Sequence, residues 1–355
     1  MGAAFGGRWA AIDIGTNSVR LLVAEVRGDT VVPVSRALRL TRLGQGVDRE
    51  RRLAPEAAAR TVAAVGELVQ QARAMQAEDI VIAGTSALRD ARDREDFCRA
   101  VERTTGLPVY VLSGPGEAAV SFMGAVRGLA SVAGGGGAGG GAAVGGEGAG
   151  AAREVWVVDV GGGSTEVVRG TAQGQVAGRA SADVGAVRMT EATVRSDPVS
   201  AEDWRHLTAA IEQGLAPLWQ ALLGDGPAEG APAPAGGLLV GVGGTVTTLA
   251  AMEQRLDPYD PDKVHGYRLS RSAVAVMLER MRAATVAQRR TWPGLQPQRA
   301  DIILAGTAIV LAVMTRLGAD SLLVSEADLL DGLILWAARL GRDPAYLVDG
   351  AGGAN

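Results

Sequence analysis

The pattern Asp-x-Gly-x-x-Ser occurs twice in this chain, 146 residues apart, in AIDIGTNSVRLL from Ala11 and in VVDVGGGSTEVV from Val157. Each copy follows an apolar, β-branched run and leads into another one, which predicts a strand, a tight polar turn and a second strand. After each hairpin the sequence alternates between strand and helix patterns, which is typical of an α/β fold with a mostly parallel sheet. An internal duplication is the simplest account of the two copies.

The turns of both hairpins have the composition of anion-binding loops. Glycine lets backbone N–H groups approach an anion closely, and Ser or Thr adds hydroxyl donors. A third glycine turn, in GVGGTVTTLAAM, lies between a strand and a helix, where helix N-terminal amides favour anions. The predicted phosphate-binding residues are therefore Gly15, Thr16, Asn17 and Ser18, then Gly161, Gly162, Gly163 and Ser164, and finally Gly243, Gly244 and Thr245. Asp13 belongs to the first set because an aspartate can hold a hydrated cation beside the phosphate.

Composition limits the class of protein. With 355 residues, 47% of them apolar, and a net charge of −4, the chain is long enough for two domains and too apolar to be disordered. Cys98 is the only cysteine, which excludes an intrachain disulfide and a cysteine-rich metal site. The sequence has no block of basic residues of the kind that would predict nucleic-acid binding. The longest apolar run, from Ile302 to Met314, is too short to span a bilayer, and no signal peptide is evident, so a cytoplasmic protein without membrane contact is expected.

Low-complexity sequence marks the domain boundaries. Residues 129–152 are nearly all Gly and Ala and are expected to form a disordered loop, because they can bury little side-chain surface. We therefore predict one domain at residues 1–128 and a second at 153–326. A last helix, about residues 327–341, is expected to pack back on the first domain, with Ser325 and Asp328 as its capping box.

Seven segments together resemble a known family. They are AIDIGTNSVRLLVAEV, RLGQGVD, AGTSALRDA, SGPGEA, VVDVGGGSTEVV, GVGGTVTTLAAM and VSEADLLDGLI. In this order they resemble the exopolyphosphatase/guanosine pentaphosphate phosphohydrolase family of the actin, hexokinase and heat-shock-protein-70 superfamily. The resemblance implies duplicated ribonuclease H-like domains with an interdomain cleft. It also implies hydrolysis of the terminal phosphoanhydride of inorganic polyphosphate or guanosine pentaphosphate, with release of orthophosphate.

The same resemblance assigns roles to single residues. Glu117, in SGPGEA at the start of a helix, resembles the family's catalytic base; alternatively, it is an ordinary first-turn Glu that the helix dipole favours. Arg89, in GTSALRD, resembles an arginine that contacts phosphate, and the alternative is a surface ion pair with Asp90 or Asp93.

Two further carboxylates complete the implied catalytic set. Asp159 and Glu166, seven residues apart around the second turn, are expected by resemblance to hold or orient Mg²⁺ and the attacking water. Magnesium needs only one or two carboxylates plus phosphate oxygens. Asp13 is expected to play the matching part in the first hairpin. The alternatives are that Asp159 caps its own turn and that Thr245 caps its helix.

Two other functions stay open on the sequence. One is a sugar or acetate kinase of the same superfamily, and the other is a non-catalytic protein that binds polyphosphate or the alarmone nucleotide guanosine pentaphosphate. The sequence does not distinguish polyphosphate from guanosine pentaphosphate as substrate, and a homodimer is plausible.

Overall fold

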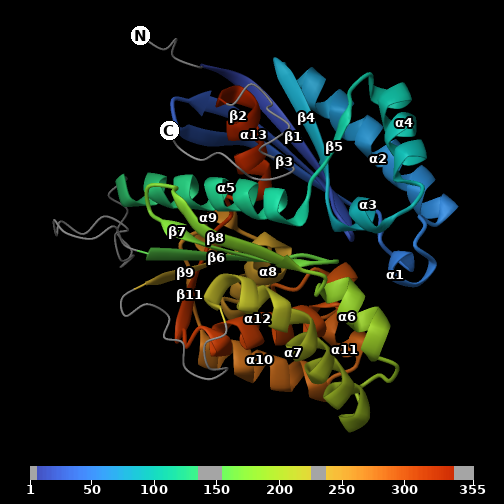
Figure 1. The fold of residues 1–355 in the computed structure, drawn as a ribbon, viewed down its shortest axis with the longest axis vertical. Coiled ribbons are helices and arrows are strands. Elements are labelled where there is room, and N and C mark those ends of the chain that lie inside the picture. The colour runs from blue at the N-terminus through green and yellow to red at the C-terminus, as the bar shows by residue number, and fades with distance from the viewer. Residues whose placement is uncertain (1–5, 135–153, 225–236, 340–355) are drawn as a thin grey trace. The chain divides into compact units, whose positions relative to one another are not determined.

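The computed structural model describes residues 6–134, 154–224 and 237–339. Contacts divide the chain into two compact units. The first unit runs to Gly128 and resumes at Ala327, whereas the second runs from Leu129 to Glu326. Each unit is an α/β domain built on a single sheet (Figure 1).

The sheet of the first unit has five strands in the order β3-β2-β1-β4-β5. Strand β1 pairs antiparallel with β2, and β2 with β3, whereas β4 and β5 run parallel to β1. The strands are β1 (Gly6–Ile14), β2 (Ser18–Arg27), β3 (Thr30–Leu40), β4 (Asp79–Gly84) and β5 (Val109–Val111).

Helices cover both faces of this sheet (Figure 1). One core joins β1, β2 and β4 to α2 and α4, and a second core on the opposite face joins the same strands to α5 and α13. Pro55 begins α2, where its missing N–H removes no helical hydrogen bond. The helices are α1 (Val47–Glu50), α2 (Pro55–Ala74), α3 (Ser86–Asp90), α4 (Arg94–Thr105), α5 (Gly114–Gly134) and α13 (Leu329–Arg339).

The second unit has a six-stranded sheet in the order β10-β11-β9-β6-β7-β8. Strands β6, β9 and β11 are parallel, and β7, β8 and β10 are antiparallel to their neighbours. The strands are β6 (Glu154–Val160), β7 (Thr165–Thr171), β8 (Val176–Ala182), β9 (Leu238–Val242), β10 (Arg268–Ser270) and β11 (Ser321–Val324).

One large apolar core fills the second unit between its sheet and helices α7, α8, α10 and α12. Helix α12, the segment that the sequence marks as its longest apolar run, is buried almost throughout. The helices are α6 (Ala186–Thr193), α7 (Ala201–Leu223), α8 (Gly243–Glu253), α9 (Pro261–Val264), α10 (Arg271–Ala283), α11 (Val286–Arg289), the 3₁₀ helix η1 (Pro297–Arg299) and α12 (Ile303–Arg316). None of the helices in the described ranges is long and apolar enough to cross a membrane.

Three expectations are corrected. The sheets are mixed rather than mostly parallel, because each repeated hairpin continues into a third antiparallel strand. The predicted loop at 129–152 begins in a helix, since α5 continues to Gly134 through residues that include good helix formers; its remainder, 135–152, lies outside the described residues.

The capping box of α13 also differs from the prediction. It lies three residues later than expected: Asp328 Oδ1 accepts from Leu330 N at 3.0 Å, and Asp331 Oδ2 accepts from Asp328 N at 3.2 Å. Both members are aspartates, a pair that the Ser-x-x-Glu/Gln pattern for such boxes does not cover.

Candidate active site

The two Asp-x-Gly-x-x-Ser segments form hairpins of the same geometry. Gly15 N donates to Ser18 O at 3.0 Å, and Gly161 N donates to Ser164 O at the same 3.0 Å. The motif aspartates occupy equivalent places in the ladders, one residue before the end of β1 and of β6. The duplication therefore extends from the sequence to the hydrogen bonds that close each turn.

In the first turn the backbone carbonyl groups already accept hydrogen bonds, whereas several N–H donors have no acceptor among the described residues. Thr41 N and Arg42 N donate to Asn17 O, and Gly44 N donates to Thr16 O at 2.9 Å. The N–H groups of Thr16 and Asn17 make no hydrogen bond to any described residue. The buried Asn17 Nδ2 is also without a hydrogen-bond partner among them. Buried donors are normally satisfied, so this turn has the character of a site for an anion.

The second turn repeats this arrangement with different partners. The first residues of α6 donate to its carbonyls: Ala186 N to Gly161 O at 3.0 Å and Val187 N to Gly162 O at 2.8 Å. Arg188 Nε donates to Gly163 O at 2.8 Å. Within the described ranges, the N–H groups of Gly162 and Gly163 again have no hydrogen-bond partner. Each hairpin thus presents two consecutive amide donors.

The carboxylates predicted to hold the metal lie side by side. Asp159 and Glu166 are directly opposite each other on β6 and β7, so their side chains project from the same face of the sheet. Glu166 is 1% exposed, and its Oε1 accepts from Ser181 Oγ on β8 at 2.7 Å. Gly243 has φ +81°, and a Cβ there would collide with the Asp159 carboxylate. Glycine at this position therefore makes room for Asp159.

Asp159 and Glu166 supply two carboxylates that could serve as ligands of a divalent metal ion such as Mg²⁺. Mg²⁺ keeps several waters and is commonly bound through one or two carboxylates and substrate phosphates. The described residues contain no group of three or more His, Cys, Asp or Glu side chains that could hold a metal ion. A metal at Asp159 and Glu166 would thus need oxygen ligands from water and substrate.

Glu117 and Arg89 come together in the first unit. Glu117 lies in the first turn of α5, where Ser113 Oγ caps the helix by accepting from Gly116 N at 3.0 Å. Its side chain is 10% exposed, and its Oε2 accepts from Arg89 Nη1 at 2.5 Å. The same guanidinium nitrogen donates to Leu112 O at 3.1 Å. Arg89 is thus engaged with the predicted base itself.

Asp90 and Asp93, the surface partners considered for Arg89, form ion pairs with Arg51 and Arg52 at 3.8 and 3.9 Å. The loop before α4 is thereby joined to the segment that follows α1.

The third glycine turn leads into α8. The Thr245 hydroxyl donates to Val160 O at 3.0 Å and so joins α8 to β6. The residue before the helix, Val242, makes no side-chain cap. The Arg299 guanidinium lies against Gly244, where a Cβ would meet its nitrogens. Sequence reasoning missed this arginine, because no motif includes it and only the fold brings η1 to the start of α8.

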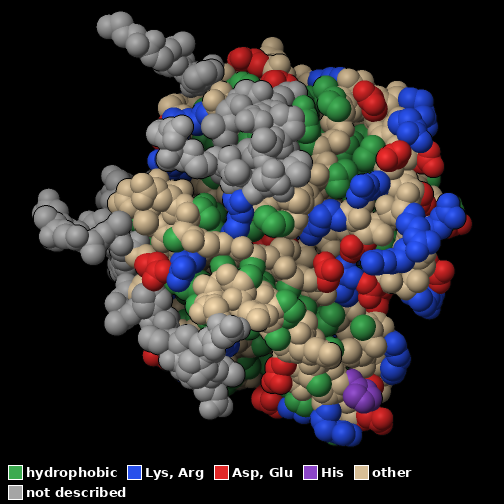
Figure 2. Space-filling model, viewed as in Figure 1, with side chains coloured by type: hydrophobic (Ala, Val, Ile, Leu, Met, Phe, Trp, Pro, Cys, Tyr) green, Lys and Arg blue, Asp and Glu red, His purple; other side chains and the backbone are tan. Residues whose placement is uncertain are grey.

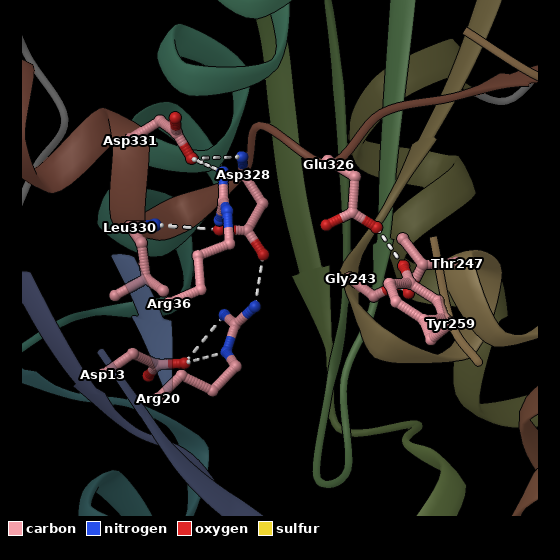
Figure 3. A network of polar contacts seen from close by, with 10 residues as sticks. All are labelled: Asp13, Arg20, Arg36, Gly243, Thr247, Tyr259, Glu326, Asp328, Leu330 and Asp331. Atoms are coloured by element: carbon pink, nitrogen blue, oxygen red, sulfur yellow. Dashed lines mark hydrogen bonds and ion pairs between the residues drawn. The ribbon is translucent and has the colours of Figure 1, made fainter. Parts of the chain in front are cut away.

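A second missed residue is Arg20. It lies opposite Asp13 on β2, and its Nε and Nη2 donate to Asp13 Oδ2 at 3.0 and 2.8 Å. Its Nη1 donates to Asp328, the capping residue of α13 (Figure 3). The signal was present in the sequence: Arg20 follows Asp13 by seven residues, as Glu166 follows Asp159.

Burial and charge act in opposite directions on Asp13. Burial raises the pKa of Asp13 to about 6, although the neighbouring Arg20 lowers it through charge and hydrogen bonding. The negative charges of Glu117 and Asp328 raise it further. Asp13 therefore interacts electrostatically with Arg20, Glu117 and Asp328.

Other features of the surface do not involve the predicted residues. An open pocket of about 660 Å³ in the second unit is lined by the end of α8, by α10 and by the segment after α11, with Met252, Met277 and Trp292 among its residues. On the face drawn in Figure 2, arginines and acidic side chains are interspersed. An anionic ligand would thus meet local donors rather than a broad positive field on that face.

Comparison with known proteins follows the same segments. The model of the Ppx/GppA phosphatase family matches residues 22–137 and 141–339. Exopolyphosphatase 2 of Mycobacterium tuberculosis is 36% identical over 342 residues, which are 92% of this chain and 98% of the relative.

Solved structures agree with this match. One of an exopolyphosphatase-like protein superposes with a TM-score of 0.80 at 32% identity and covers 94% of this chain and 98% of its own. The Aquifex aeolicus member of the Ppx/GppA family gives 0.73 at 28% identity, with 95% and 99% covered. Both units thus have the fold of the actin-like ATPase superfamily, as predicted. The chain belongs to the Ppx/GppA phosphatase family.

Proposed function

We propose that this protein hydrolyses the terminal phosphoanhydride of inorganic polyphosphate, of guanosine pentaphosphate or of both, and releases orthophosphate. The observation that carries the proposal is the pair of hairpin turns, each with two adjacent N–H donors that no described residue satisfies. Such donors suit phosphate oxygens. The name of the Mycobacterium tuberculosis relative, exopolyphosphatase, supports polyphosphate as one substrate.

In the proposed reaction Glu117 acts as general base. Its carboxylate accepts a proton from water as the water oxygen attacks the terminal phosphorus, and the bond from that phosphorus to the bridging oxygen breaks. The shortened chain leaves with the bridging oxygen. Arg89, which donates to Glu117 at 2.5 Å, fixes the orientation of the carboxylate and places positive charge beside the reacting phosphoryl group.

In this scheme each turn binds phosphate oxygens in its own unit. Thr16 and Asn17 of the first hairpin, and Gly162 and Gly163 of the second, would donate through their backbone N–H groups, with Asn17 Nδ2 as an additional donor. Asp159 and Glu166 would hold Mg²⁺, which when bound neutralises charge on phosphate oxygens. Because these donors are fixed by the fold before substrate binds, they need little reorganisation during the reaction.

Phosphate release from long polyphosphate, short polyphosphate and guanosine pentaphosphate, measured side by side with Mg²⁺ and with a chelator, tests the proposal. We expect release from at least one of these substrates and its loss when the metal is removed. Release from none of them at any metal concentration would overturn the proposed function. Equal release with and without chelator would overturn the role given to Mg²⁺.

A further inference from the structure

A chain of charged side chains in the first unit leads from the phosphate-binding turn to α13. Arg20 on β2 donates twice to one oxygen of Asp13, at 3.0 and 2.8 Å, and once to Asp328 (Figure 3). Asp13 and Asp328 are each 4% exposed, whereas the Arg20 side chain is 22% exposed. A guanidinium bound to two buried carboxylates has little freedom to reorient.

The two oxygens of Asp13 differ in their surroundings. Oδ2 receives both hydrogen bonds from Arg20, whereas Oδ1 is buried and has no hydrogen-bond partner among the described residues. A buried carboxylate oxygen without a donor is costly in a folded protein, which suggests that a water or ligand satisfies it in the working enzyme. Arg20 thus determines which oxygen remains available.

Asp328 is fixed by hydrogen bonds from three groups or to them. Its Oδ1 accepts from Leu330 N at 3.0 Å at the start of α13, and its Oδ2 accepts from Arg20. Its own N–H donates to Asp331 Oδ2, and Asp331 pairs with Arg36 of β3 at 3.6 Å. The start of α13 is therefore tied to the sheet at two points: Arg20 on β2, which also binds Asp13, and Arg36 on β3, which does not.

The second hairpin has a different residue at the position that corresponds to Arg20. Opposite Asp159 it carries Glu166, which Ser181 holds at 2.7 Å. If the arginine served only to close a hairpin of this type, the duplicated hairpin would need one as well. Of the two motif aspartates, only Asp13 has an arginine at the position directly across the hairpin.

We propose that Arg20 and Asp328 are positioning residues for phosphoanhydride hydrolysis, which hold Asp13 so that its Oδ1 faces the ligand bound at the Thr16–Asn17 turn. The proposal rests on the proposed function, since it assumes that this turn binds the phosphate chain. Neither residue needs to touch substrate. The raised pKa of Asp13 agrees with this role, because loss of Arg20 would leave burial unopposed and favour the protonated, uncharged form.

Arg20→Gln, Arg20→Lys and Asp328→Asn test the proposal, with Arg36→Gln as the matched control. Arg36→Gln breaks the other tie of α13, at Asp331, without changing a partner of Asp13. Each variant is compared with the parent by kcat and KM for phosphate release, by thermal unfolding, and by the pH dependence of kcat.

We expect Arg20→Gln to lower kcat by about 10²-fold with KM changed by less than about threefold, because the turn amides that bind phosphate remain. The kcat of Arg20→Lys and that of Asp328→Asn should each be about tenfold lower than the kcat of the parent. The acidic limb of the kcat profile should move to higher pH in Arg20→Gln. Arg36→Gln should keep the parent's kcat and pH profile even if its unfolding temperature falls.

Equal losses of kcat in Arg20→Gln and Arg36→Gln would overturn the proposal, since they would indicate that Arg20 only anchors α13. A parent-like kcat in a folded Arg20→Gln would overturn it as well. These outcomes differ from failure of the proposed function, in which the parent itself releases no phosphate.

Discussion

Opposite Asp13 the first hairpin carries Arg20, and opposite Asp159 the second carries Glu166. One exchange of charge at equivalent positions gives the two hairpins different chemistry. The first holds its aspartate with a cation, and the second places two carboxylates side by side, which are the oxygen ligands that divalent metals such as Mg²⁺ take in proteins.

Gly243 sets the space available to Asp159. At φ +81° an alanine is strained, and its Cβ would also collide with the Asp159 carboxylate. Gly243→Ala should therefore destabilise the second unit by about 2–4 kcal/mol, from backbone strain and overpacking together, and should reduce phosphate release. Chemical denaturation and a phosphate assay check this.

Gly266→Ala is the matched control for that change. Gly266 has φ +78°, and a Cβ there would meet no atom within 4 Å. Only strain of about 1 kcal/mol is expected, with activity retained. If the two variants lose equal stability and equal activity, contact with Asp159 is not what requires glycine at position 243.

At the scale of elements, the periodic patterns predicted most of the fold. The hairpins, α2, β11 and the buried α12 follow from apolar spacing, because such patterns must face a core. The prediction failed where a contact made by the fold decides the outcome. The cap of α13 lies at Asp328 because Arg20 and Leu330 N meet there, and the sequence alone favoured Ser325.

Site residues divide in the same way. Glu117, Asp159 and the glycine turns are carried by motifs within single segments, so the sequence identifies them as candidates. Two other arrangements depend on which strands and helices become neighbours in the fold. They are the ion pair of Arg89 with Glu117 and the ion pairs of Arg20 with Asp13 and Asp328. Cross-strand spacing could have revealed Arg20, whereas only the fold reveals Arg299.

The buried cap of α13 makes stability depend on pH. Burial raises the pKa of Asp331 to about 6, despite the opposing effect of Arg36. An aspartate in an unfolded chain has a pKa of about 4. Between about pH 6 and pH 4 the folded chain therefore holds a proton that the unfolded chain has lost, so this group's contribution to the free energy of unfolding rises as pH falls and falls as pH rises.

Asp331→Asn removes this titration and keeps an oxygen that can accept from Asp328 N. Its stability relative to the parent should be highest near pH 7.5 and should decline by about 2 kcal/mol by pH 4.5. Urea unfolding at both pH values measures the difference. A difference between variant and parent that does not change with pH would contradict the assignment of a raised pKa to Asp331.

At the scale of the whole molecule, the first unit is completed by residues that come last in its sequence. Helix α13 buries Trp336, whose ring meets Tyr110 edge-on with centroids 5.3 Å apart. The core on this face of the sheet contains residues from β1, β2 and β4 as well as α13. The stability of the N-terminal sheet thus depends on a helix that follows the whole second unit in the sequence.

Trp336→Ala should destabilise the first unit by about 3–5 kcal/mol, because it leaves a large cavity at a fully buried position. Trp336→Phe, which keeps an aromatic ring, should cost clearly less. Denaturant unfolding combined with proteolysis of the first unit can measure both. A loss below about 1 kcal/mol in Trp336→Ala would show that α13 contributes little to this core.

Glu117 is proposed to activate the water that cleaves a terminal phosphoanhydride. The most direct test of this role is kcat for phosphate release from polyphosphate by the parent, Glu117→Gln, and the control Glu102→Gln, which removes an exposed glutamate of α4. We predict a loss of about 10²–10⁴-fold for Glu117→Gln in a folded protein, and parent-like release for Glu102→Gln. Release by Glu117→Gln at the rate of the parent would show that Glu117 is not the general base.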